Sequence, residues 1–336
     1  MKNKVVFVVL LLPFLCFAQT FSGRVIDKVT QQPIETVAVY FDNTTIGTTT
    51  NENGEFSITY SAAVQSTLVI SYLGYEKVFI QDYRSKNNIT IELVEAENAL
   101  DEVYLEFDDG LTRRQKLRLF RKEFLGTSKF ARSCRILNDD DLVLRYNKKQ
   151  KALYANSSKP ILVENRALQY KISFEINEFE IKYRYANLKT NNFTLHSVTY
   201  TGTNFFENLE KFHKKRFIKN RELAYRGSVQ HFMRALFNKD LAGNNYQIFN
   251  KRFKVNEWDF FEVHQLDNKD LRRVTLKDKV AILFEKSQQS AIQLEVAEFY
   301  VDKFGNYAPI KGVYFSGTLG NQRVGDALPS DYGFEN

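Results

Sequence analysis

Apolar and polar residues alternate in short runs between residues 21 and 93, and turn-forming residues separate the runs. Alternation at every second position puts apolar side chains on one face of a β-strand. Gly47 and the Asn53-Gly54 pair stand between two runs, where backbone conformations with positive φ cost little. We therefore expect a small β-sandwich over residues 19–95. The residues expected on its inner faces include Val37, Val39, Phe41, Phe56 and Ile58.

Helical spacing replaces alternation in a basic segment over residues 112–124. Leu117, Phe120 and Phe124 recur every three or four positions, and Gly126 follows as a C-terminal cap. The pattern predicts an amphipathic basic helix. Its basic face suits either solvent or a membrane surface, and we favour a solvated helix that packs on the second domain.

Strand patterns return after this helix, and the clearest covers residues 170–185. The apolar residues occupy even positions up to Ile176 and odd positions from Phe179 onward, so the apolar face changes at Asn177-Glu178. Either a two-residue hairpin or a β-bulge would keep both halves facing the core. The sequence does not choose between them.

Residues 205–238 switch to helical spacing, and Gly227 followed by Ser228 predicts a break between two helices. Strand patterns then return in FKVNEWDFFEVHQL, KVAILFE, AIQLEVAEFYVD and KGVYFSGTL, whereas GDALPSDYGFEN has none. The expected fold class is mainly β and α+β overall. A larger antiparallel β domain with two or three helices is expected at residues 111–336, after an acidic linker at residues 96–110.

The start of the chain indicates its destination. Lys2 and Lys4 precede an apolar run that ends at Ala18, which is typical of an export signal. The run is shorter than the roughly 20 apolar residues of a membrane-spanning helix. We expect residues 1–18 to be removed, without a lipid anchor at Cys16. The mature protein would then work in the periplasm or at the outer membrane.

Cysteine content and charge add two limits. Only Cys134 would remain after export, so we expect no intramolecular disulfide, and we interpret this thiol as a small buried apolar residue. Removal of residues 1–18 takes away two lysines and no acid, so the mature charge would be 45 − 40 = +5, which is mild for a chain of this length, and an exported chain rarely meets nucleic acid. We therefore expect no nucleic-acid partner, and no membrane-spanning segment after removal of the signal.

Residues 20–95 carry a set of short motifs in a fixed order. They are Gly23-x-Val25, Pro33-Ile34, Gly47-Thr48-x-Thr50, Asn53-Gly54-x-Phe56 and Ile70-Ser71-Tyr72-x-Gly74-Tyr75. In this order they resemble the carboxypeptidase-like regulatory domain. The resemblance implies a seven-stranded, transthyretin-like β-sandwich without catalytic activity. Such domains precede the plug and barrel of TonB-dependent transporters, or accompany other envelope modules, in Bacteroidota.

A second resemblance covers residues 107–332. The segments EFLGTS, ENRALQYKISFEI, KNRELAYRGSVQHFMRAL and GDALPSDY are similar to an uncharacterised region that follows the same sandwich in many Bacteroidota proteins. That resemblance implies an architecture and a provenance, and no activity.

The sequence offers no convergent set of catalytic or metal-binding residues. No two of its four histidines lie three to five residues apart, and it has no nucleophile elbow, phosphate loop or dinucleotide fingerprint. Glu262 and His264 share a strand face, which favours a half-exposed ion pair over a catalytic pair. Asp139-Asp140-Asp141 favours a turn cap over a cation loop. We therefore predict no catalytic residue, no cofactor and no metal.

One local cluster, between residues 211 and 231, is both basic and aromatic. Such a surface suits an acidic partner, for example a lipopolysaccharide phosphate or the acidic patch of another envelope protein. A solvated helix face is the alternative. The predicted partner-binding residues are Lys214, Lys215, Arg216, Arg221, Tyr225, Arg226 and His231.

These patterns predict a non-catalytic accessory protein of the envelope. The sandwich would dock or space, and the second domain would bind a partner or polymer in an outer-membrane uptake or assembly system. Two alternatives stay open. An envelope glycan hydrolase would need two carboxyl groups about 5–10 Å apart in a deep cleft. A small outer-membrane β-barrel over residues 140–320 would have to accommodate two polar helices.

Overall fold

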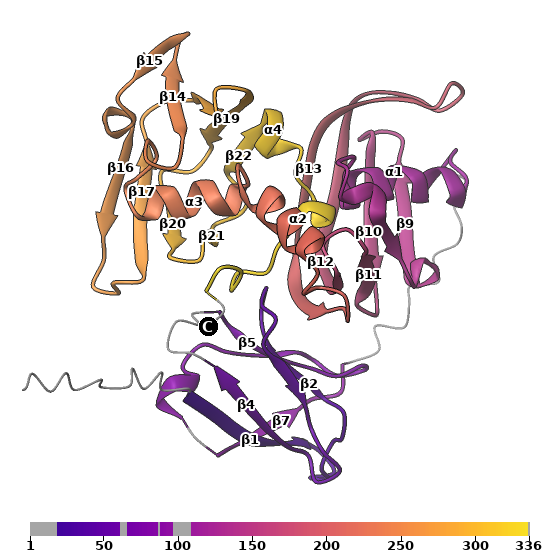
Figure 1. Cartoon of the computed structure of the whole chain (residues 1–336). Helices are drawn as coiled ribbons and strands as arrows, with labels where there is room; N and C mark the ends of the chain where they lie inside the picture. Colours follow the sequence, from indigo (N-terminus) through magenta and orange to yellow (C-terminus); the bar gives the residue numbers. More distant parts are fainter. Residues whose placement is uncertain (1–18, 61–65, 87, 97–108, 335–336) are drawn as a thin grey trace, which may run out of the picture.

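The computed structural model describes residues 19–60, 66–86, 88–96 and 109–334, so the expected export signal and most of the expected linker lie outside the described residues. The described chain is mainly β, as predicted, and its core divides into three hydrophobic clusters. Figure 1 shows a small unit at the bottom and two larger units above it, at the right and at the left. Two helices and the C-terminal segment, residues 321–334, lie between the larger units.

The N-terminal unit is the predicted seven-stranded β-sandwich. Its strands are β1 (Gln19–Asp27), β2 (Ala38–Phe41), β3 (Gly47–Thr49), β4 (Glu55–Tyr60), β5 (Leu68–Ser71), β6 (Val78–Ile80) and β7 (Ile89–Leu93). They form two sheets, with the strand orders β4-β1-β7 and β3-β2-β5-β6. Only the pairing of β1 with β7 is parallel. Val37, Val39 and Phe41 are fully buried, as their alternation predicts.

Gly54 and Gly47 of the sandwich are suited to their positions for different physical reasons. Gly54 has φ +73° in the turn before β4, as the sequence predicts. The same expectation for Gly47 is wrong, because Gly47 lies in β3 and does not have positive φ. A Cβ at Gly47 would stand 2.6 Å from the ring of Phe205, which belongs to the neighbouring unit. Gly47 therefore provides space for a contact between units.

The second unit is an antiparallel sheet that packs against a helix. The helix is α1 (Arg113–Leu125), and the strands are β8 (Cys134–Ile136), β9 (Leu142–Asn147), β10 (Ala152–Ser157), β11 (Ile161–Asn165), β12 (Tyr170–Asn187) and β13 (Asn192–Asn208). Strand β12 pairs with β13 along its whole length, and also with β11 in its first half and β10 in its second. Strands β8 and β9 lie beyond β11 and β10.

Strand β12 resolves the alternative left open at Asn177-Glu178. It is one continuous strand with a β-bulge at this point, in which Asn177 is the extra residue, and two further register shifts flank Tyr183. The bulge keeps Phe174 and Phe179 on the same face, with ring centroids 5.2 and 6.0 Å from that of Phe124 in α1. The pairs on either side of the bulge are Ile176 with Gly202 and Glu178 with Thr201.

Helix α1 forms where the sequence predicts a basic amphipathic helix. Thr112 and Gln115 form a capping box at its start, and Gly126 ends it at φ +92°. Phe120 and Phe124 are fully buried against the sheet. The helix thereby covers the apolar face on which the two halves of β12 meet.

The two central helices are α2 (Lys215–Tyr225) and α3 (Val229–Phe237). Gly227 lies between them at φ +72°, and the Ser228 hydroxyl accepts a hydrogen bond from the His231 N–H. The predicted break at Gly227 and the predicted cap at Ser228 are therefore confirmed.

The predicted start of the helical region at residue 205 is wrong. Strand β13 continues to Asn208, because the first residues of β12 pair with it there. The helices also belong to different cores: Ala224 of α2 packs in the second unit, whereas α3 packs in the third.

The third unit has two antiparallel sheets around a core that includes α3. One sheet has the order β15-β14-β18-β19-β22, and the other β16-β17-β20-β21. A helix of one turn, α4, was not expected from the sequence. The bounds are β14 (Tyr246–Asn250), β15 (Phe253–Val255), β16 (Phe261–Gln265), β17 (Leu271–Leu276), β18 (Val280–Phe284), β19 (Gln288–Leu294), β20 (Phe299–Asp302), β21 (Tyr307–Ala308), β22 (Val313–Ser316) and α4 (Gly317–Gly320).

Two runs that look like single strands in the sequence are divided between sheets. FKVNEWDFFEVHQL gives β15 and β16, with a short 3-10 helix at Glu257–Asp259 between them. AIQLEVAEFYVD gives β19 and β20. The buried residues of these strands face one shared core, so the alternation of apolar residues does not reveal where the chain changes sheet.

Candidate functional site

The predicted partner-binding residues do not form one surface. Lys214, Lys215 and Arg216 are exposed where α2 begins, and Lys219 is exposed one turn later. None of these four takes part in an ion pair with another described residue. Ile218 and Leu223, 52% and 45% exposed, lie on the same helix. The exposed part of α2 is therefore a cationic face with an apolar strip, here called the α2 face.

Arg221 points away from this face. It is 4% exposed, and its guanidinium donates to the carbonyls of Leu168 (2.8 Å) and Gln169 (3.0 Å). It also lies 3.7 Å from the ring centroid of Tyr170. Carbonyl groups and an aromatic face therefore surround the cation. Arg221 therefore joins α2 to the start of β12 and is not available to a partner.

Arg226 forms an ion pair with Glu285 on the surface of the third unit. Tyr225 is partly buried, and its ring centroid lies 4.9 Å from that of His231. These residues line the joint between α2 and α3, and only Arg226 is exposed.

His231 is buried in the core of the third unit. Its Nδ1 accepts a hydrogen bond from the Gly227 N–H (3.1 Å), which leaves Nε2 as the donor, 3.2 Å from Asn244 Oδ1. The hydroxyl of Tyr246 lies 3.0 Å from Nδ1. Burial lowers the pKa of His231, so the ring is neutral at neutral pH. With both ring nitrogens engaged, His231 stabilises the joint and is not poised as a general base.

Arg234 of α3 was not singled out by the sequence analysis. It is 7% exposed, and its guanidinium donates to the carbonyls of Phe304 (2.9 Å), Ser330 (2.8 Å) and Tyr332 (2.9 Å). Two of these carbonyls belong to the C-terminal segment. The sequence does contain a sign of this role, because Arg234 interrupts the apolar sequence HFMRALF, where an unsatisfied charge would be costly.

The C-terminal segment contacts all three units. Its residue Arg323 lies 3.7 Å from Glu123 of α1, and its Gly325 carbonyl accepts from Asn165 of β11 (3.0 Å). Its Ser330 N–H donates to the carbonyl of Asn43 in the sandwich (2.5 Å). Together with the bonds to Arg234, these contacts hold the three units in one arrangement.

The sandwich rests on the outer face of β12 and β13 through polar and aromatic contacts. Lys77 forms an ion pair with Glu175 of β12, and Ser71 donates to the same carboxylate (2.9 Å). The hydroxyl of Tyr40 lies 3.2 Å from that of Thr203 in β13. Glu175 is 8% exposed, so the pair is largely removed from water and its geometry matters.

A loop of the sandwich, residues 42–46, contacts both β13 and the C-terminal segment. The Asp42 carboxylate accepts a hydrogen bond from the Asn204 N–H (2.8 Å), and Thr45 donates to Asp331 (2.6 Å) through its hydroxyl. Burial raises the pKa of Asp42 to about 6, and the nearby charge of Glu175 adds to that rise. This junction was not apparent in the sequence, because its residues lie far apart along the chain.

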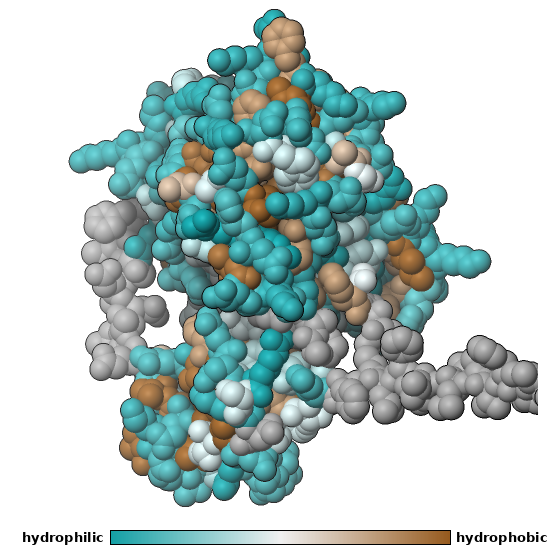
Figure 2. Space-filling view, turned by 90° about the vertical axis from the view of Figure 1, so that its left-hand side faces the viewer, coloured by the Kyte–Doolittle hydropathy of each residue, from teal (hydrophilic) through white to brown (hydrophobic). Residues whose placement is uncertain are grey.

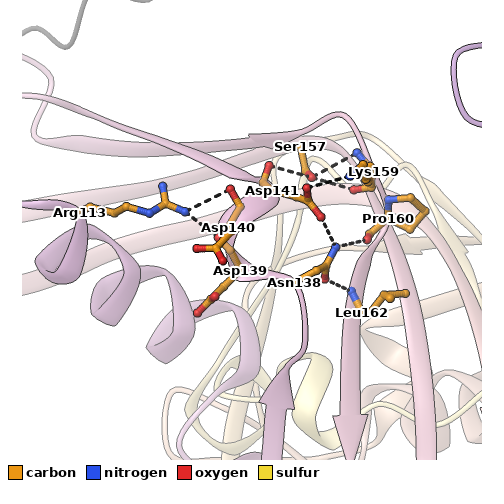
Figure 3. Close-up of polar contacts among 9 residues, drawn as sticks. All are labelled: Arg113, Asn138, Asp139, Asp140, Asp141, Ser157, Lys159, Pro160 and Leu162. Carbon is orange, nitrogen blue, oxygen red and sulfur yellow. Dashed lines mark hydrogen bonds and ion pairs between the residues drawn. The ribbon is translucent and has the colours of Figure 1, made fainter.

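The acidic triplet is a turn, as the sequence favours. Asp139–Asp141 forms a short 3-10 helix, and Figure 3 shows its three carboxylates pointing in different directions. Asp141 accepts from Asn138 (2.9 Å) and pairs with Lys159 (3.2 Å), while Arg113 donates to the Asp139 carbonyl (2.7 Å). Protein groups already engage this loop, which therefore does not resemble a cation site.

Two further residues, Cys134 and His264, have surroundings that indicate a structural role and not a catalytic one. Burial raises the pKa of the Cys134 thiol to about 12, which disfavours the nucleophilic thiolate. His264 lies 3.8 Å from Glu262, and both side chains are about half exposed, as expected for a surface ion pair.

Within the described ranges, no group of three or more His, Cys, Asp and Glu side chains is placed to hold a metal ion. In the same ranges, no helix combines the length and the apolar character needed to cross a bilayer.

Comparison with known families agrees with the geometry of the sandwich. Residues 21–105 match the family model described as CarboxypepD_reg-like domain. The N-terminal unit is therefore a carboxypeptidase-like regulatory domain, a regulatory or binding type of domain that is not catalytic. The match ends before α1 and does not extend to the two larger units. No curated protein matches the chain.

Proposed function

We propose that this chain is a non-catalytic accessory protein of the cell envelope, in which the sandwich docks against two larger units and the α2 face binds an acidic partner. Export is part of the proposal and rests on residues 1–18, which read as a signal peptide. The division of the chain into a sandwich at 19–95, a linker at 96–110 and a larger region at 111–336 is also part of the proposal. The setting would be an outer-membrane uptake or assembly system.

The observation that carries the proposal is the set of unpaired cations on the α2 face. Lys214, Lys215, Arg216 and Lys219 are exposed, and no described carboxylate pairs with them. Arg226, which follows α2, differs from these four because it pairs with Glu285. A row of unpaired cations attracts an acidic surface over a Debye length and increases the association rate.

The partner we favour is the acidic patch of another envelope protein or a phosphate-bearing envelope polymer. Ile218 and Leu223 lie among the cations, so a partner with apolar groups among its acids would remove both from water. Glu222 sits on the same helix and would disfavour a partner whose charge is not matched to the cations.

The test replaces the cations and leaves the fold unchanged. In the triple variant Lys214→Gln, Lys215→Gln and Lys219→Gln, three charges are lost on an exposed helix surface. Exposed pairs contribute roughly 0.2–1 kcal/mol each, so recovery of the partner from native envelope extracts should fall about tenfold. Cross-linking with the mature chain as bait, followed by mass spectrometry, measures the recovery.

The matched control removes the same charge elsewhere on the surface. Arg114→Gln and Arg118→Gln on the exposed side of α1 are combined with Lys149→Gln in the turn between β9 and β10, and none of these three cations takes part in an ion pair with another described residue. Recovery should stay at the wild-type level in this control. Equal recovery by the α2 variant and the wild type, or equal losses in both variants, would remove the α2 face from the proposal.

A further inference from the structure

The hairpin of β14 and β15 has an unusual tip. Asn250 pairs with Phe253, so Lys251 and Arg252 form a two-residue turn. Both turn residues have positive φ, 46° and 75°, as in a type I′ turn. Asn and Gly are the residues that usually occupy such turns, since a branched or long side chain is strained there. The tip therefore places two cationic side chains at positions where their backbone conformation is strained.

Phe253 is the second unusual feature of this tip. It is 76% exposed, more than any other aromatic side chain among the described residues. Packing does not account for it, because Phe253 lies outside the apolar side chains that form the core of the third unit. An exposed aromatic ring on a narrow hairpin has apolar area to bury against a partner.

The charge around the ring is positive and unpaired. Lys251, Arg252 and Lys254 are all exposed, and none takes part in an ion pair with another described residue. The Asp278 carboxylate accepts a hydrogen bond from Asn250 at the base of the turn (3.3 Å). That bond and a second from Asn250 to the Lys279 carbonyl (3.3 Å) fix the hairpin to the turn between β17 and β18.

The hairpin stands at the end of the molecule opposite the sandwich. Figure 1 shows β14 and β15 at the top, and Figure 2 shows apolar atoms at that same end, surrounded by hydrophilic side chains. The tip can therefore reach a flat surface before any other part of the third unit does. A broad helix face such as α2 lacks this geometry.

From these features we propose that the β14–β15 tip, Lys251 to Lys254, inserts the ring of Phe253 into the headgroup region of an anionic lipid bilayer. Aromatic rings are favoured at that depth, and Lys and Arg beside them are attracted to anionic headgroups. The tip is separate from the α2 face and needs no partner protein. The two proposals can therefore fail independently.

The test is flotation of the mature chain with vesicles. Neutral vesicles contain phosphatidylcholine alone, and anionic vesicles contain about a third phosphatidylglycerol. The wild type should float with anionic vesicles and stay behind with neutral ones. Phe253→Ala, and separately the triple variant Lys251→Gln, Arg252→Gln and Lys254→Gln, should each lower the bound fraction about tenfold.

Two controls match these changes elsewhere on the molecule. Phe79→Ala removes a ring that is 51% exposed on the sandwich. Lys148→Gln, Lys149→Gln and Lys151→Gln remove three charges from the turn between β9 and β10, which has no aromatic tip. Both controls, and the α2 triple variant, should bind vesicles as the wild type does. Failure of the wild type to float, wild-type flotation of the tip variants, or equal losses in the controls would overturn the proposal.

Fluorescence reports the depth of insertion directly. The chain has one tryptophan, Trp258, so Phe253→Trp in a Trp258→Phe background carries its only tryptophan at the tip. Anionic vesicles should shift its emission to shorter wavelength, and brominated lipids should quench it. An unshifted and unquenched emission in the presence of anionic vesicles would show that the ring stays in water.

Discussion

At the scale of single residues, Arg221 and Arg234 look like surface cations in the sequence, but both are buried and join separate elements. Arg221 is four residues after buried Phe217 and three before buried Ala224, so it shares their side of α2. The side of α2 on which Arg221 lies becomes evident only once the helix is known to begin at Lys215. In the sequence, Arg221 looks like its exposed neighbours.

Arg234 offers a direct test of this structural role. Replacement by Ala leaves the carbonyls of Phe304, Ser330 and Tyr332 without their donor, and each bond to a charged group contributes about 1.5–3 kcal/mol. We expect the free energy of unfolding to fall by about 3–5 kcal/mol in urea titrations. Arg234→Lys should recover only part of the loss, because one ammonium cannot reach three divergent carbonyls as a planar guanidinium does.

The control for this experiment is Arg118→Ala on the exposed side of α1. It should change the free energy of unfolding by no more than about 0.5 kcal/mol. If Arg234→Ala behaved like Arg118→Ala, the three carbonyl contacts would not stabilise the protein.

At the scale of elements, the bulge in β12 decides which side chains reach the core. Deletion of Asn177 joins two paired positions, Ile176 and Glu178, and restores a regular alternation in which Phe179 still points inward. We expect this deletion to fold and to lose about 1–2 kcal/mol, chiefly through the altered bend. Far-UV circular dichroism and a cooperative urea transition would report a retained fold.

Deletion of Glu180 is the matched comparison, since it removes one residue from the same strand where no bulge exists. It would turn the buried Ile181 toward solvent, at about 1.5–3 kcal/mol, and would displace Tyr183, which lies between two further register shifts of the pairing with β13. We expect a larger loss of stability than for the Asn177 deletion. A Glu180 deletion as stable as the Asn177 deletion would contradict the assigned register.

Local patterns predict single elements well in this chain and their arrangement poorly. The α1 caps at Thr112 and Gly126 and the break at Gly227 follow from side-chain and backbone chemistry within a few residues. The division of AIQLEVAEFYVD into two sheets does not, because both strands bury residues in one core. The junction around Asp42 was equally out of reach, since its partner Asn204 is distant in the sequence.

At the scale of the whole molecule, the docking of the sandwich depends on buried carboxylates. Burial raises the pKa of Asp42 to about 6, above its value in an unfolded chain, about 3.9. The docked state therefore holds a proton at pH 5 that the unfolded chain has released. Stability from this group is present at low pH and is lost as the pH rises through 6.

Asp42→Asn tests this dependence, because the amide is neutral and its oxygen can still accept from the Asn204 N–H. We expect the variant to be more stable than the wild type at pH 7 and to keep only about half of that advantage at pH 5, because the advantage disappears only below the pKa of the unfolded chain, about 3.9. Urea midpoints at the two pH values measure the difference. Asp267→Asn, on an exposed loop, is the control, and a constant difference between Asp42→Asn and the wild type would refute the prediction.

The C-terminal segment also has a consequence for the order of assembly during synthesis. Residues 321–334 emerge after every element that they join, so α1, α3 and the sandwich loop are complete before their common contact exists. The sandwich can therefore dock on β12 and β13 before residues 321–334 are made, and the contacts that join α1, α3 and the sandwich loop form last. A chain that ends before residue 321 would keep the contacts of the sandwich with β12 and β13 and would lack those that join α1, α3 and the sandwich loop to one another.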